Sequence, residues 1–182
     1  VASRPFPGLE IRLSHEAEIL GTGGGLSNAR RFFEDVEFFF VHNADVYCEL
    51  DLGWALRTHT SSGALATLVV GEGAADRALL VNGEGKLKGW IGEEGEKIAP
   101  QAGNNLRRVD LCGIHIVSRE IFDYISEEKG MFSILRPYMR AVSQGRDIRA
   151  LDLGGNFWLD AGTPQALETL QKRLGSPGFV AS

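Results

Sequence analysis

Hydrophobic residues in this chain fall into short segments separated by glycine-rich and polar stretches. Residues 36–45 and 64–70 are continuous apolar runs of strand length, a pattern typical of strands covered on both faces. Residues 9–16 alternate between apolar and polar positions, which predicts a strand with one face in solvent. Leu26, Ala29 and Phe33 recur at helical spacing and predict a helix after the glycines at 21–25.

The rest of the pattern predicts alternating strands and helices. The predicted strands are residues 9–16, 36–45, 64–70 and 106–117, with hairpins at 78–91, turning at Asn82-Gly83, and at 147–153 with 156–160. The remaining predicted helices are residues 52–63, 119–129 capped by Ser118, 131–145 and 163–175, and the polar residues 92–105 are expected to form a loop. Such alternation predicts an α/β fold: a Rossmann-like three-layer sandwich with a mixed, mainly parallel sheet.

Two helix ends carry specific signals. Thr163 is expected to cap the last helix, with Pro164 at its first position and Gly175 at its end. Pro137 would either kink the helix at 131–145 or mark its start.

Composition narrows the class of protein. The 182 residues are 43% hydrophobic, which suits one domain over residues 1–182 and argues against disorder. A net charge of −5 gives no basic surface for nucleic acid or for an anionic membrane. No apolar run approaches the ~20 residues of a spanning helix, and the first residues lack the apolar centre of a signal peptide. We therefore expect a cytoplasmic protein, with Cys48 and Cys112 as reduced thiols.

The glycine-rich segment at 21–25 lies between a predicted strand and a predicted helix. Glycines in that position let backbone N–H groups approach a ligand closely. The segment lacks the Gly-Lys-Ser/Thr of a Walker loop and the spacing of a dinucleotide fingerprint. On these residues alone it is either a ligand-binding loop or a tight connection.

Two aspartates end predicted strands. Asp45 ends the predicted strand at 36–45, and Asp160 ends the last predicted strand. Ligands of α/β sheets bind beyond the carboxyl ends of strands, where carboxylates on separate strands can share one or two Mg²⁺ ions. The alternatives are an Asx turn at Asp45 and a simple turn at Asp160.

Five stretches occur together in a recognisable order: EILGTGGGL (18–26), FFFVHNADVYCELDL (38–52), ALATLVV (64–70), GIHIVSREIFDYI (113–125) and NFWLDAGTPQAL (156–167). In these residues the chain resembles the sugar-1-phosphate nucleotidylyltransferase family across nearly its whole length. The likeness is greatest to short bacterial mannose-1-phosphate guanylyltransferases and N-acetylmuramate-1-phosphate uridylyltransferases. The resemblance implies a Mg²⁺-dependent enzyme that forms a nucleoside diphosphate sugar and pyrophosphate from a nucleoside triphosphate and a sugar 1-phosphate. A monomer or a homodimer would fit.

The resemblance also assigns roles to residues. Asp45 and Asp160 would be the catalytic metal ligands. The nucleotide would be bound by Leu20, Gly21, Thr22, Gly23, Gly24 and Asn43. The sugar would lie against Gly113 and Trp158, with Lys97 of the Glu96-Lys97 pair either holding the sugar phosphate or forming a solvated loop pair. The four histidines and the three tryptophans are expected to be structural, with Trp158 also a candidate for the wall of the sugar pocket because it lies next to the strand end at Asp160.

The chain departs from the family pattern in two places. Family members begin with a strand and a glycine-rich loop carrying an Arg and a Lys for the triphosphate, and residues 1–20 contain no such loop. We therefore expect either a fragment that lacks its N-terminal strand–helix units, or a non-catalytic sugar-nucleotide-binding or regulatory module. Ala44 stands where the family usually has Gly, and its methyl group would crowd the ribose or strain the turn.

Overall fold

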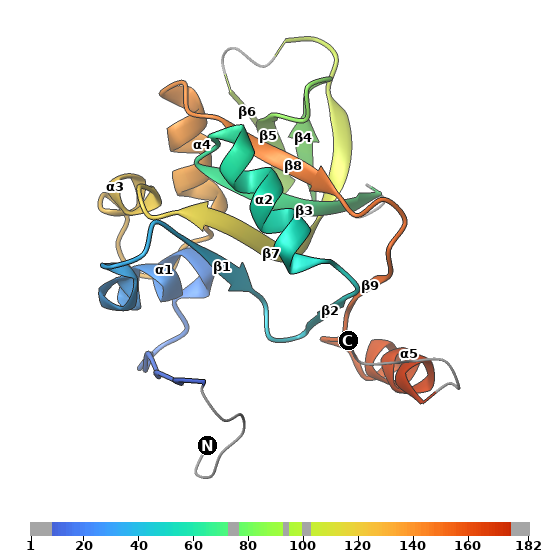
Figure 1. The fold of residues 1–182 in the computed structure, drawn as a ribbon. Coiled ribbons are helices and arrows are strands. Elements are labelled where there is room, and N and C mark those ends of the chain that lie inside the picture. The colour runs from blue at the N-terminus through green and yellow to red at the C-terminus, as the bar shows by residue number, and fades with distance from the viewer. Residues whose placement is uncertain (1–8, 73–76, 93–94, 100–102, 176–182) are drawn as a thin grey trace.

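The computed structural model describes residues 9–72, 77–92, 95–99 and 103–175. Its main sheet has seven strands, six of them in the order β6 (Gly95–Ile98), β5 (Leu87–Gly92), β4 (Ala78–Val81), β7 (Arg107–Ser118), β3 (Ala66–Glu72) and β8 (Ile148–Asp152). The seventh, β1 (Phe38–His42), pairs with the far end of β7 (Figure 1). A separate two-stranded sheet joins β2 (Val46–Cys48) to β9 (Trp158–Asp160).

Helices cover both faces of the main sheet. The helices are α1 (Gly21–Asn28), the 3₁₀ helix η1 (Arg30–Phe33), α2 (Leu52–Ser62), α3 (Ile121–Ile125), α4 (Leu135–Ser143) and α5 (Pro164–Leu174). Leu68 and Val69 of β3 belong to different buried clusters, since successive strand residues point to opposite faces. One cluster includes Ala55 of α2, and the other includes residues of α3 and α4. The predicted α/β fold with three layers is confirmed.

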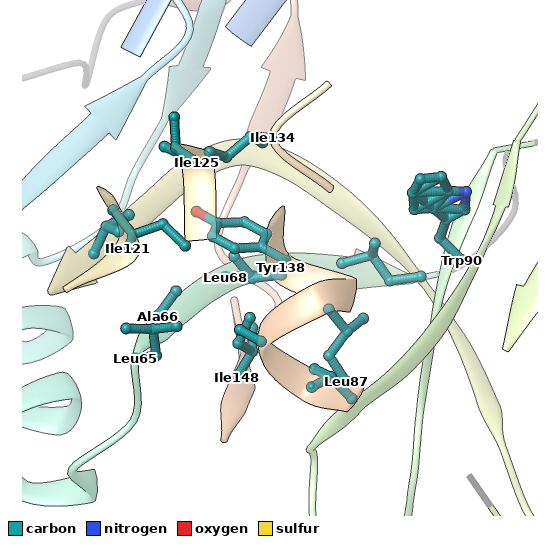
Figure 2. Packing of buried hydrophobic residues seen from close by; sticks show 14 of the residues in the cluster. Leu65, Ala66, Leu68, Leu87, Trp90, Ile121, Ile125, Ile134, Tyr138 and Ile148 are labelled. Carbon is teal, nitrogen blue, oxygen red and sulfur yellow. The ribbon is translucent and has the colours of Figure 1, made fainter. Parts of the chain in front are cut away.

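The larger cluster packs around Tyr138 of α4 (Figure 2). The Tyr138 side chain is fully buried, and its hydroxyl lies 2.9 Å from Nδ1 of His115 in β7. This contact satisfies two polar groups inside an otherwise apolar layer, which such a buried position requires.

The expected predominance of parallel pairing is wrong. Among the described strands, only β3 and β8 pair in parallel. The long strand β7 is the common antiparallel partner of β1, β3 and β4. The apolar run in β1 reflects an aromatic cluster rather than burial on both faces: Phe39 packs against Phe33 at 4.1 Å between ring centroids, while Phe40 stays 36% exposed.

The two predicted hairpins have different outcomes. The hairpin at 78–91 is confirmed as β4 and β5, and Asn82 Oδ1 accepts hydrogen bonds from the N–H groups of Glu84 and Lys86 in the turn. The prediction of a hairpin at 147–160 is wrong, because β8 pairs with β3 in the main sheet and β9 pairs with β2 in the separate sheet. Gly154 and Gly155, with φ of 61° and 84°, separate the two strands and redirect the chain.

Two further strand assignments are corrected. Residues 9–16 form no strand; Leu9 and Leu13 are 60% and 71% exposed, and no described strand pairs with this alternating segment. Part of the expected loop at 92–105 is strand β6, which pairs with β5. A backbone with polar side chains can form this edge strand because its hydrogen bonds come from the main chain.

The helix ends follow most of the sequence signals. Thr163 accepts a hydrogen bond from Ala166 N, and α5 starts at Pro164 as predicted. Pro137 is the third residue of α4, where a helix needs no N–H donor, so it marks a start rather than a kink. Ser118 caps no helix: it ends β7, and its hydroxyl contacts Ala64 O and His59 Nε2.

Candidate functional site

The two predicted metal ligands converge. Val46 and Asp160 are paired across β2 and β9, and Ala161 N donates to Asp45 O at 2.7 Å. A Cβ added to Gly162 would lie 3.0 Å from Asp160 Oδ1 and 3.4 Å from Asp45 Oδ2. Both carboxylates therefore face one point, and the short pairing of β2 with β9 holds them there.

The chemistry of this pair suits a hard cation. Both aspartates are exposed, and neither forms an ion pair with another described residue. No group of three or more His, Cys, Asp or Glu that could hold a metal occurs in the described part of the chain. Mg²⁺ is commonly held by one or two carboxylates together with water and substrate phosphates. Asp45 and Asp160 fit that mode.

Beside Asp160 lies a cavity of about 830 Å³, a size typical of small-molecule sites. Its floor is the stretch Asp110–Gly113 of β7. Cys112 on this floor is fully buried, and burial raises the pKa of its thiol to about 12. The thiol stays protonated at neutral pH and is no nucleophile, in line with the expected reduced thiol.

Gly113 and Asn43 meet at the side of the cavity nearest the carboxylates. Gly113 has φ of 72° at a register shift in β7, and its carbonyl accepts from Asn43 N at 2.9 Å. A Cβ on Gly113 would lie 2.9 Å from Asn43 Nδ2 and 3.0 Å from Val46 Cγ2. Both residues were predicted site residues, and in the structure they are in contact on the cavity wall.

The glycine-rich segment is helical and not a loop. Helix α1 starts at Gly21, and Gly23 N donates to Phe132 O at 3.1 Å. A Cβ on Gly23 would lie 2.5 Å from the Phe132 ring, so only glycine allows this close approach. Gly21 and Thr22 line the cavity, whereas Gly23 and Gly24 are buried behind them and Leu20 precedes the helix.

The remaining sugar-site predictions fall in two regions. Trp158 lines the cavity and packs over β3, where a Cβ on Gly71 would lie 2.6 Å from its Nε1. Lys97 lies in β6 opposite Trp90, and its side chain is outside the described part of the structure.

The rest of the cavity wall was not predicted from the sequence. It is formed by the segment that enters α4 and by β4 and β5: Arg77, Ala78, Leu79, Trp90, Ile91, Gly92, Met131, Phe132, Ser133, Leu135 and Arg136. These residues carry no common motif, and only the packing of α4 beside β5 brings them together. The one available signal was Trp90, a large aromatic residue inside a predicted hairpin.

Comparisons with known proteins agree with the resemblance. The chain is 31% identical over 162 residues to the mannose-1-phosphate guanylyltransferase catalytic subunit beta of Drosophila pseudoobscura pseudoobscura, covering 87% of this chain and 41% of that protein. It is 33% identical over 163 residues to the protein of the same name from Dictyostelium discoideum, covering 87% and 42%. The chain thus spans about two-fifths of the length of these relatives. No protein-family profile matches it.

Solved structures agree on the fold. HddC from Yersinia pseudotuberculosis, in a complex with GMP-PN, superposes with a TM-score of 0.63 at 21% identity over 87% of this chain and 64% of that one. A UDP-glucose pyrophosphorylase complexed with UDP-glucose gives a TM-score of 0.65 at 18% identity over 86% and 64%. Within the described residues, no helix is both long enough and apolar enough to cross a bilayer.

Proposed function

We propose that this chain, which is similar in sequence and in fold to the sugar-1-phosphate nucleotidylyltransferases, transfers a nucleotidyl group from a nucleoside triphosphate to a sugar 1-phosphate. The products are a nucleoside diphosphate sugar and pyrophosphate. The observation that carries the proposal is the convergence of Asp45 and Asp160 beside a cavity large enough for the sugar.

The carboxylates supply the electrostatics of the reaction. Asp45 and Asp160 would hold Mg²⁺, which would supply positive charge to neutralise the α-phosphate of the nucleotide. An oxygen of the sugar phosphate attacks the α-phosphorus in line, the bond to the bridging oxygen breaks, and pyrophosphate leaves. No covalent intermediate with the protein is needed, because positioning and charge stabilisation suffice.

The other site residues position the substrates. The sugar is proposed to lie over Gly113 on the cavity floor, where Asn43 packs in the place that a side chain of residue 113 would take, and Trp158 provides an apolar wall. The start of α1, from Leu20 to Gly24, binds the base through Gly21 and Thr22, the two that reach the cavity. Lys97 is proposed to hold the sugar phosphate.

The test is pyrophosphate release by the chain with and without Mg²⁺. GTP and mannose 1-phosphate are the first pair, because the similar proteins are named for that reaction; UTP, CTP and dTTP with other sugar 1-phosphates follow. Mg²⁺-dependent release with any pair supports the proposal. Release that is unchanged in excess EDTA contradicts the role of the carboxylates.

The second candidate is a sugar-nucleotide-binding module without catalysis. It requires only the cavity and lining residues such as Gly21, Thr22 and Gly113, and no group that assists the departure of pyrophosphate. Binding of a nucleoside diphosphate sugar with no turnover of any substrate pair would support this candidate over the first. A single domain over residues 1–182, a cytoplasmic location and a monomer or homodimer remain parts of the proposal, to be checked by limited proteolysis, fractionation and sedimentation.

A further inference from the structure

The two-stranded sheet that brings the aspartates together is short. Its strands β2 and β9 pair at three positions, and neither pairs with a described strand of the main sheet. One face of the ribbon packs against the cluster on the α2 face of the main sheet, through Val46, Cys48 and Trp158. A two-stranded ribbon is marginally stable by itself, so contacts at its ends decide how firmly the two strands are held together.

Arg173, near the end of α5, makes such a contact. Its Nε and Nη2 donate to the two carboxylate oxygens of Glu49, each at 2.9 Å. Its guanidinium carbon lies 4.0 Å from the centre of the Phe157 ring. Glu49 directly follows β2, Phe157 directly precedes β9, and Glu49 N donates to Phe157 O at 2.9 Å. Arg173 therefore joins the two strands at the end remote from the aspartates.

The position of α5 turns this contact into a closed path along the chain. The helix begins at Pro164, shortly after Asp160, and has no buried residue. Figure 1 shows it at the margin of the molecule, beyond β9. Arg173 brings the other end of the helix back to the residue that follows β2. The chain on one side of the carboxylate pair is thus tied to the chain on the other side.

The chemistry of the contact is specific to arginine. A guanidinium binds both oxygens of a carboxylate through parallel N–H donors and can stack on an aromatic ring at the same time. A lysine ammonium keeps the charge but lacks the planar fork. The side chains of Arg173 and Glu49 are both partly exposed, and exposed ion pairs contribute little to global stability. We therefore expect the effect of this contact to be local.

We propose that Arg173 is a positioning residue for the metal site: by holding Glu49 and Phe157 together it fixes the pairing of β2 with β9. That pairing sets the distance between the carboxylates of Asp45 and Asp160. The inference rests on the proposed function, because it takes these two carboxylates as the metal ligands. Arg173 does not line the cavity and acts only through the strands.

Two measurements on the same set of proteins test the proposal. Mn²⁺, which favours the same oxygen ligands as Mg²⁺, is titrated into each protein, and free Mn²⁺ is measured by electron paramagnetic resonance. Hydrogen exchange followed by NMR reports on the Ala161 amide, which donates to Asp45 O beside the ribbon. The variants are Arg173→Gln, Arg173→Lys and Asp45→Asn, the last of which defines the Mn²⁺ binding that belongs to the site.

The matched control is Arg146→Gln. Arg146 also forms an ion pair with a glutamate, Glu120, and its side chain is 38% exposed against 42% for Arg173. Neither residue of the control pair lines the cavity. A general effect of losing a surface arginine would appear equally in this variant.

Arg173→Gln should weaken Mn²⁺ binding about three- to tenfold, somewhat less than the loss of a group bonded directly to a metal ligand. Exchange of the Ala161 amide should become faster by a similar factor, with unchanged circular dichroism. Arg173→Lys should keep part of the affinity, and Arg146→Gln should match the unaltered chain.

Unchanged Mn²⁺ affinity and Ala161 exchange in Arg173→Gln, with faster exchange confined to α5, would mean that Arg173 only attaches the helix. That result, or an equal loss of affinity in Arg146→Gln, overturns the inference and leaves the proposed function standing. Mn²⁺ binding by Asp45→Asn as tight as that of the unaltered chain overturns both.

Discussion

The positions of single residues in the site depend on contacts that leave no room for a larger side chain. Gly113 combines a left-handed backbone with direct contact to Asn43, and Gly162 lies between the two carboxylates. At such positions a single added methyl group changes both the backbone and the geometry of the ligand site.

Gly113→Ala should destabilise the protein by about 2 kcal/mol or more, because the new Cβ meets Asn43 and Val46 in a backbone region that alanine rarely adopts. The control is Gly145→Ala: φ there is 83°, but a Cβ would meet nothing within 4 Å. The control should lose only about 1 kcal/mol of backbone strain. Urea unfolding measures both, and equal losses would mean that the contact with Asn43 has no energetic weight.

The two aspartates carry a signal in the sequence, whereas the part of the cavity wall formed by α4 and the segment before it carries none. Asp160 ends β9, whereas Asp45 lies in the turn between β1 and β2, and the antiparallel pairing of β2 with β9 brings their carboxylates together. The general position of ligands in α/β sheets indicated these two segments of the chain but not that pairing. Arg136 and Met131 reach the cavity only through the packing of α4, which no local pattern reports.

Among the helices and strands, α1 shows most clearly how tertiary packing can override the low helix propensity of glycine. Glycine costs roughly 1 kcal/mol in a helix relative to alanine, so a run of glycines predicts a loop. Here Gly21, Gly23 and Gly24 allow the helix to approach the segment from Gly130 to Phe132 at distances that no Cβ could accept.

Two substitutions in α1 separate these effects. Gly23→Ala should destabilise the protein by about 1–3 kcal/mol through overpacking, because its Cβ would lie 2.5 Å from the Phe132 ring. In Gly25→Ala the new Cβ contacts only the carboxylate of Glu16, the far end of a flexible side chain. This substitution should leave the free energy of unfolding unchanged or raise it by up to about 1 kcal/mol. Urea unfolding compares the two, and similar effects in both variants would contradict the packing argument.

For the strands, it was easier to predict which segments are strands than to predict which strands pair with one another. Strands β3 and β7 and the hairpin of β4 and β5 follow directly from their apolar patterns. Whether a strand pairs in parallel depends on distant partners, and one long strand, β7, serves three neighbours here. Strand β6 was not predicted because its residues are mostly polar residues and glycine, a composition typical of a loop.

At the scale of the whole molecule, a buried histidine links stability to pH. His115 lies at the centre of the main sheet beside Tyr138, and burial lowers its pKa from the ordinary 6.5 to about 4. The unfolded chain protonates near pH 6.5, so it binds more protons than the folded chain between pH 6.5 and 4. The contribution of neutral His115 is fully present above pH 6.5 and is lost as the pH falls towards 4.

The unaltered protein should therefore lose about 3 kcal/mol more of its free energy of unfolding between pH 7.5 and pH 4 than His115→Gln loses over the same interval. Comparing each protein with itself removes the cost of the substitution at neutral pH. Urea unfolding at both pH values measures the two losses. Equal losses would mean that protonation of His115 does not contribute to the pH dependence of the free energy of unfolding.

The central claim is that Asp45 and Asp160 together carry nucleotidyl transfer. The most direct measurement is the initial rate of Mg²⁺-dependent pyrophosphate release by Asp45→Asn and Asp160→Asn, with Asp35→Asn as the control. Asp35 is an exposed carboxylate before β1, at the end of the strand opposite Asp45. We expect each site variant to lose at least about 100-fold in rate, as for loss of a charge-stabilising group, with unchanged circular dichroism, and the control to keep full activity. Turnover near that of the unaltered chain in either site variant would contradict the account.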